Sequence, residues 1–152
     1  MSERFTAASG RTVVSRTSAE ELGTLAHIVV DAKRRQVAWL VVGKGRKAVV
    51  VPWDEVSAFG PDAIMIADES ALKAPRDDRE QAAADGKLEL IGKRVLSDLG
   101  NDLGKVTDVV FDPDSGAIES VAVDQREAPA DSLLGAGSFA VIVLEPAQAS
   151  AG

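Results

Sequence analysis

The residues best suited to chemistry are three aspartates in the segment LGKVTDVVFDPDSG, residues 103–116. Asp112, Asp114 and Gly116 resemble the start of an EF-hand calcium loop, which needs oxygen ligands at positions 1, 3 and 5, glycine at 6 and glutamate at 12. Counted from Asp112, however, glycine falls at position 5 and Val123 at position 12. The spacing favours a hairpin turn whose aspartate accepts backbone hydrogen bonds. A divalent-cation site on Asp108, Asp112 and Asp114 remains the weaker alternative.

Other catalytic groups are scarce. His27 is the only histidine and there is no cysteine, so one chain cannot supply a two-histidine metal site or a thiolate nucleophile. No nucleophile with a matching partner can be assigned to His27, and a structural surface role is favoured. The glycine-rich LLGAG at 133–137 lacks the Lys-Ser/Thr pair of a phosphate loop. We expect no enzyme activity and no cofactor.

Composition narrows the class of partner. The net charge is −7, and from residue 87 onward 5 Lys/Arg stand against 11 Asp/Glu, which disfavours direct binding to a phosphate backbone. No stretch approaches the roughly 20 apolar residues of a membrane span, and the N-terminus has no signal-peptide core. We expect a cytoplasmic protein that does not insert into membranes.

The chain repeats one pattern twice. GRTVVS recurs as GKRVLS, LGTLAHIVVDAKRR lies over LGKVTDVVFDPDSG, and QVAWLVV lies over AIESVAV. The glycine-to-aspartate spacing is the same from Gly23 to Asp31 as from Gly104 to Asp112. Fixed-period similarity of this kind indicates a tandem structural repeat.

Each repeat reads as short β-strands joined by tight turns. Strands are predicted near 11–15, 25–30, 37–42, 47–51 and 63–67 in the first unit, and near 93–96, 105–111, 117–123 and 139–144 in the second. A polar, alanine-rich stretch at 75–85 predicts a solvated helix between them. The prediction is a mainly-β chain of two small antiparallel β-barrels joined by a short helical linker.

The units are assigned to residues 1–68 and 89–152, with the linker at 69–88. After FAVIV the second unit has no obvious match for the final strand DAIMIAD of the first. We therefore expect it to lack a final strand, which would leave an edge for another segment, subunit or partner to cover.

The chain resembles the PRC-barrel family in several segments. These are GRTVVS and GKRVLS, the LGKVTDVVFDPDSG core, VVVPWDEV and LLGAGSFAVIV. That family is named for the cytoplasmic domain of the photosynthetic reaction-centre H subunit and is shared by a ribosome-maturation factor. The resemblance covers nearly the whole chain outside the linker. It implies a small β-barrel that serves mainly as an adaptor for protein partners, without an active site. A role in ribosome assembly would rest on family analogy alone.

The residues expected to bind a partner are apolar side chains outside the predicted cores. Trp39 matches Ser120 of the second unit, so it packs against the sister unit or serves as an interface anchor. Trp53 is expected to plug a barrel end. We expect two units about a pseudo-twofold axis, forming an adaptor or assembly module for a protein partner or a second copy. The alternative is a small-ligand or metal sensor. The predicted contact residues are Trp39, Val29, Val110, Leu133 and Leu134.

Overall fold

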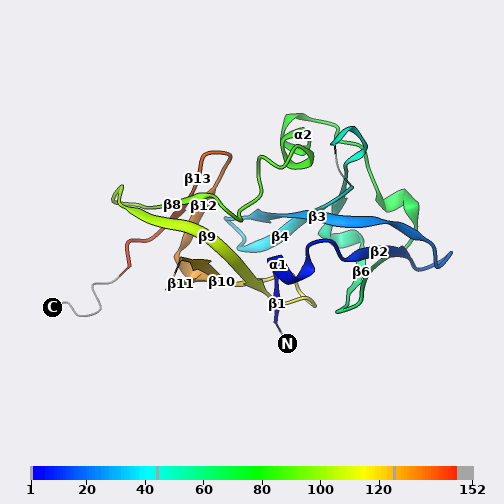
Figure 1. Ribbon diagram of the computed structural model, residues 1–152, viewed down its shortest axis with the longest axis horizontal. Coiled ribbons are helices and arrows are strands. Elements are labelled where there is room, and N and C mark those ends of the chain that lie inside the picture. The colour runs from blue at the N-terminus through cyan, green and yellow to red at the C-terminus, as the bar shows by residue number, and fades with distance from the viewer. Residues whose placement is uncertain (1, 44, 125, 147–152) are drawn as a thin grey trace.

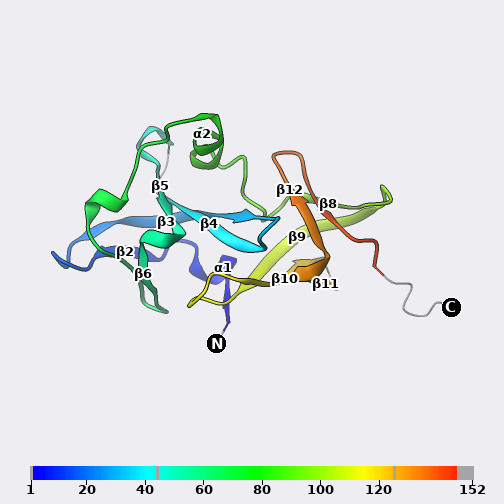
Figure 2. The same ribbon diagram turned by 180° about the vertical axis from the view of Figure 1, so that it is seen from behind.

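The structure is a computed structural model that describes residues 2–43, 45–124 and 126–146. Within these residues the chain forms two β-sheets, one from each half of the sequence, which lie side by side in both views (Figure 1, Figure 2). This confirms the prediction of a mainly-β chain with two repeated units. No helix among the described residues is long and apolar enough to cross a membrane.

The first sheet contains six strands, and a 3-10 turn lies between the fourth and the fifth. The strands are β2 (Thr12–Ser15), β3 (Glu21–Asp31), β4 (Gln36–Val42), β5 (Val49–Pro52), β6 (Val56–Phe59) and β7 (Ala63–Ile66). Their order is β5-β4-β3-β2-β7-β6, and only β2 and β7 run parallel. The 3-10 turn η2 (Trp53–Glu55) follows Pro52, which has no N–H to continue the strand ladder.

The second sheet repeats this arrangement. Its strands are β8 (Arg94–Ser97), β9 (Asp102–Phe111), β10 (Ile118–Val123), β11 (Arg126–Pro129), β12 (Leu133–Ala136) and β13 (Ala140–Val143). Their order is β11-β10-β9-β8-β13-β12, with β8 and β13 parallel. The 3-10 turn η4 (Ala130–Ser132) again follows a proline. The short strand β1 (Glu3–Arg4) adds to β9 and leads into helix α1 (Phe5–Ala8).

The prediction of two small antiparallel β-barrels is confirmed only in part, because both units are present but their sheets are not closed barrels. Each sheet contains one parallel pair, and among the described residues β5 and β6, or β11 and β12, remain as its edges. In each unit a 3-10 turn interrupts the antiparallel meander after β5 or β11. The hairpin that follows then crosses over, so that its second strand lies beside the first strand of the unit and runs in the same direction. A parallel pair requires a crossover of this kind.

The prediction that the second unit lacks a final strand is also wrong, because β13 is the counterpart of β7. Both strands pair in parallel with the first strand of their unit. The connection from β4 to β5 spans residues 43–48, whereas that from β10 to β11 spans only 124–125. This shortening shifts all later positions by four residues. FAVIV therefore corresponds to the final strand of the first unit, and REAP, which has no β-branched residue, corresponds to β5.

The long hairpin of each unit has the same register. Ile28 pairs with Leu40 as Val109 pairs with Val121, and each hairpin carries two register shifts at matching places. The repeated glycine lies at the start of this hairpin with φ of +150° at Gly23 and +114° at its counterpart. A Cβ at Gly23 would lie 2.7 Å from Val42 Cγ1. The Leu-Gly motif is thus repeated because the close approach of the strands excludes a side chain.

The two units share one hydrophobic core. Buried side chains from both sheets form a single cluster, with Phe59 and Phe111 packed edge to face at a centroid distance of 5.2 Å. The hairpin turns also pair, since the N–H of Val37 donates to the C=O of Gly116 at 2.8 Å. The N–H of Ile118 donates to the C=O of Arg35 at the same distance. Val37 is the counterpart of Ile118 in the repeat, and Arg35 is the counterpart of Gly116. Each unit therefore donates to the other from the same position and accepts at the same position, as expected for a pseudo-twofold axis.

Helix α2 (Asp78–Ala84) lies between the units in the sequence and covers the outer face of the first sheet (Figure 1). Its N-terminus is capped by Asp77, which accepts a hydrogen bond from the Glu80 N–H at 2.8 Å. Glu80 in turn accepts from the Arg76 N–H at 3.0 Å. The prediction of a solvated linker helix is wrong, because Ala83 and Ala84 are buried against the sheet.

Candidate protein-interaction surfaces

The outer face of the first sheet is occupied by the chain itself. Val29 lies on this face as predicted, but it is only 1% exposed because α2 packs over it. Trp39 also packs against this cluster, and its indole ring lies 5.4 Å from the guanidinium carbon of Arg79 on α2. This contact is with α2 and not with the second unit, and binding of the half-buried Trp39 to an external partner stays a prediction. The other members of the cluster are Ala26, Val41, Ala48, Val50, Ala83, Ala84 and Leu88.

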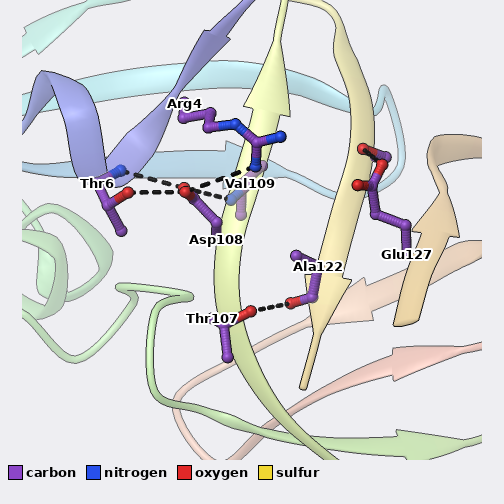
Figure 3. A network of polar contacts seen from close by, with 8 residues as sticks. Arg4, Thr6, Thr107, Asp108, Val109, Ala122 and Glu127 are labelled. Atoms are coloured by element: carbon purple, nitrogen blue, oxygen red, sulfur yellow. Dashed lines mark hydrogen bonds and ion pairs between the residues drawn. The ribbon is translucent and has the colours of Figure 1, made fainter. Parts of the chain in front are cut away.

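The matching face of the second sheet is polar instead. Ser120, the counterpart of Trp39, donates a hydrogen bond from its hydroxyl to Glu127 at 2.9 Å. Thr107 donates to the C=O of Ala122 at 3.4 Å, as Figure 3 shows. Val110 is buried beside β1, so its predicted exposure is wrong. In the first unit α2 covers this face, and the residues beneath the helix are apolar.

Asp108 holds the N-terminal segment on β9. Its carboxylate accepts from the Thr6 N–H at 3.1 Å and from the Thr6 hydroxyl at 2.7 Å, and Arg4 lies 3.7 Å away (Figure 3). The side chain therefore satisfies a free N–H in the first turn of α1. These contacts give Asp108 a structural role within the chain.

Asp112 shapes the hairpin turn. Its carboxylate accepts from the Asp114 N–H at 2.8 Å, as Asp31 does from the Lys33 N–H at 3.0 Å in the first unit. Hydrogen bonds from the backbone of Asp114 and from Ser115 lower the pKa of Asp112. Across the described residues, Asp108, Asp112 and Asp114 do not gather into a metal-binding cluster. The geometry supports the hairpin turn.

His27 is half-buried and lies beside α2. Its Nδ1 atom is 3.2 Å from a carboxylate oxygen of Glu89, off the line of a hydrogen bond, so the contact is electrostatic when the ring is protonated. The ring also packs on Gly86, just after α2. Two adjoining pockets of about 250 and 530 Å³ share His27, Ala26 and Leu25 in their lining. His27 thus has a packing role at the junction of α1 and α2.

Exposed apolar side chains gather in the second unit. Leu133 is buried in the shared core, which makes it unavailable to a partner, but Leu134 is 42% exposed. The other exposed large apolar residues among those described are Leu99 at 70%, Phe139 at 77% and Leu144 at 46%. Three of these four belong to the β12–β13 hairpin or directly follow it.

The first unit carries no such residues at the matching places. By strand register, Leu134 corresponds to Ser57, Phe139 to Asp62 and Leu144 to Ala67. The counterparts of all three are small or polar. Of these exposed residues, the sequence analysis predicted only Leu134 as a contact residue. The shorter β10–β11 connection changes the alignment of the two repeats by four residues, so the differences at Phe139 and Leu144 were not visible.

The comparisons with known proteins agree with this repeated architecture. The sequence model of the PRC-barrel domain family matches the chain twice, at residues 4–72 and 88–142. The chain belongs to the PRC-barrel domain family. Both matches start and end close to the sheets described above, so this PRC-barrel protein carries two copies of the domain in tandem. No curated protein matches the chain.

Proposed function

We propose that this tandem PRC-barrel protein is a non-enzymatic cytoplasmic adaptor or assembly module that binds a protein partner through the β12–β13 hairpin. The observation that carries the proposal is the exposure of Leu134, Phe139 and Leu144 on that hairpin. Single exposed apolar residues are ordinary on protein surfaces, but a group of them favours an interaction site. Aromatic residues are also enriched at interfaces.

The internal repeat supports this interpretation, because the first unit is a matched reference for the fold. The β6–β7 hairpin has the same strand pairing with serine, aspartate and alanine at the three positions. The backbone therefore does not require large apolar residues there. A binding role in the second unit accounts for the difference.

The proposal can be tested with the full chain as bait in a lysate of the source cells. Leu134→Ser and Phe139→Asp together give the second unit the residues of the first. Leu99→Ser is the matched control, because Leu99 is exposed but lies in the β8–β9 turn. We expect quantitative mass spectrometry to find proteins retained by the wild type and by Leu99→Ser but lost with the double variant.

Thermal unfolding of each bait separates binding from folding. All three baits should melt within a few degrees of one another, because the substituted side chains are exposed. Equal capture by all three baits would contradict the proposal. Retrieval of only tagged and untagged copies of the chain would identify the partner as a second copy.

A further inference from the structure

The outer edge of β5 is covered in the first unit. Lys73 forms an antiparallel bridge with Val50, with N–H to C=O distances of 3.0 Å and 2.8 Å in the two directions. The segment around Lys73 therefore acts as a short additional strand. It enters this position after the 3-10 turn η3 (Glu69–Ala71), whose N-cap Asp68 accepts from the Ser70 N–H.

In the described part of the chain, the corresponding edge of β11 has no such partner. Glu127 is the counterpart of Val50, since Val50 pairs with Val41 and Glu127 pairs with the matching Ala122. By this register the N–H and C=O of Glu127 point away from β10. Among the described residues, no segment pairs with the outer edge of β11. An unpaired strand edge can accept a further strand.

The segment that covers β5 also fills the end of the first unit. Ala71 is buried, and Leu72 packs against the shared core. Side chains alternate along an extended chain, so Leu72 points to the core side while Lys73 points to the outer face. The same core cluster contains Leu22, Val42 and Ile66, and Val42 pairs with Val49, the neighbour of Val50 on β5.

The second unit has a cavity at the matching place. It measures about 100 Å³ and is lined by Leu103, Val123 and Val143, the counterparts of Leu22, Val42 and Ile66. Ala128 and Pro129 of β11 contribute to the wall. An apolar cavity of roughly 150 Å³ holds a benzene ring. The cavity beside β11 therefore has room for one aliphatic side chain such as leucine.

Charge at the edge defines the partner further. Lys73 lies opposite Val50 in the first unit, and Glu127 replaces Val50 in the second. Opposite charges at directly paired positions stabilise strand pairing. Charged residues on an edge strand also hinder indiscriminate pairing. Glu127 thus favours a strand that places a basic residue opposite it.

We propose that the edge of β11 and the adjoining cavity, together called the β11 site, bind an extended segment of a protein partner as an added strand. The segment has a small residue, then leucine, then lysine or arginine, as in Ala71-Leu72-Lys73. Main-chain hydrogen bonds to Glu127, leucine in the cavity and the basic residue against the carboxylate supply recognition. This inference rests on the proposed adaptor function and names the chemistry of the partner.

The probe is a fluorescein-labelled synthetic peptide with the sequence DESALKAP, residues 68–75, titrated into the full chain. We expect saturable binding by fluorescence anisotropy, with slowed hydrogen exchange at the Glu127 amide. A peptide with glycine in place of leucine should bind at least tenfold more weakly, because it leaves the cavity unfilled and is neutral toward Arg126, which also lines it.

A charge exchange tests the pairing directly. Glu127→Lys should weaken binding of the lysine peptide, and a peptide with glutamate in place of lysine should regain affinity for this variant. Glu119→Lys is the matched control, since Glu119 is exposed on the neighbouring strand β10. It should leave the affinity for the lysine peptide within about twofold.

Three outcomes would overturn the inference. They are the absence of peptide binding, the same affinity for both peptides on Glu127→Lys, and protection of the Glu127 amide that rises with protein concentration without peptide. The last result would assign the β11 site to a second copy of the chain. Capture through the β12–β13 hairpin is measured separately, so failure of the peptide leaves the adaptor proposal standing.

Discussion

The indole ring of Trp53 lies directly over the α-carbon of Gly116, where the 3-10 turn of the first unit meets the hairpin turn of the second. A Cβ at position 116 would lie 2.7 Å from the Trp53 ring atom Cε2, and the backbone φ there is +81°. Trp53 also packs edge to face with Phe111 at a centroid distance of 6.4 Å. Contact between the units thus depends on a missing side chain.

Gly116→Ala should lower the free energy of unfolding by about 2–4 kcal/mol, because it combines a left-handed backbone cost with overpacking against Trp53. Urea denaturation monitored by tryptophan fluorescence measures this loss. Gly100→Ala is the matched control, since Gly100 has φ of +85° and open space around it. Equal losses in the two variants would show that the contact with Trp53 carries no strain.

Ala83→Glu should detach α2 from the first sheet, because it places a charge against the buried cluster that contains Val29 and Val41. We expect a loss of about 1–3 kcal/mol and faster hydrogen exchange at residues 78–84. Asp78→Glu, at an exposed position of the same helix, should change neither quantity appreciably. Unchanged exchange in Ala83→Glu would contradict the packing of α2.

Asp108→Ala should loosen the N-terminal segment, because Thr6 loses two hydrogen bonds to the carboxylate. The expected loss in the free energy of unfolding is about 1–3 kcal/mol, with faster exchange concentrated at residues 3–8. Asp114→Ala, at an exposed turn position, is the comparison variant. Similar exchange in both variants would argue against this role of Asp108.

Asp112 should contribute to stability at neutral pH and lose that contribution in acid. Its pKa is lowered by the backbone hydrogen bond from Asp114, so the carboxylate is favoured in the folded state. The contribution is fully present above the ordinary aspartate pKa of about 3.9 and disappears as pH falls through the lower folded value. Urea unfolding of Asp112→Asn from pH 2 to 7 should show a shallower acid limb than the wild type. Parallel curves would contradict the prediction.

Calcium and magnesium should leave the melting temperature unchanged at millimolar concentrations. A cation bound to the folded chain would raise the melting temperature by mass action, but the Asp112 carboxylate is engaged by its own turn. Differential scanning calorimetry with each salt, and with potassium chloride at matched ionic strength, makes the measurement. A rise specific to the divalent ions that is lost in Asp112→Asn would restore the sensor alternative.

The repeat itself could be predicted from local sequence, because its determinants act within a few residues. Gly23 and Gly104 begin matching hairpins, and Asp31 and Asp112 cap matching turns through bonds to residues two positions ahead. These requirements recur wherever the hairpin recurs. The hairpin turn was therefore predictable without coordinates.

The final strand of the second unit was predicted wrongly for a related reason. Strand identity depends on partners, and β13 is defined by its parallel pairing with β8. The four-residue difference between the β4–β5 and β10–β11 connections has no signal in local periodicity. Only the pairing of strands distant in the chain places REAP at an edge.

The sequence by itself determined two β units and their matching turns. The tertiary structure decided which apolar residues are exposed. Val29 and Leu134 look alike as surface candidates, yet α2 covers Val29 and leaves Leu134 in solvent. Burial is a property of segments that meet in space, and periodicity reports only which residues share a face. The difference between the units is therefore an effect of packing that the repeat alone cannot show.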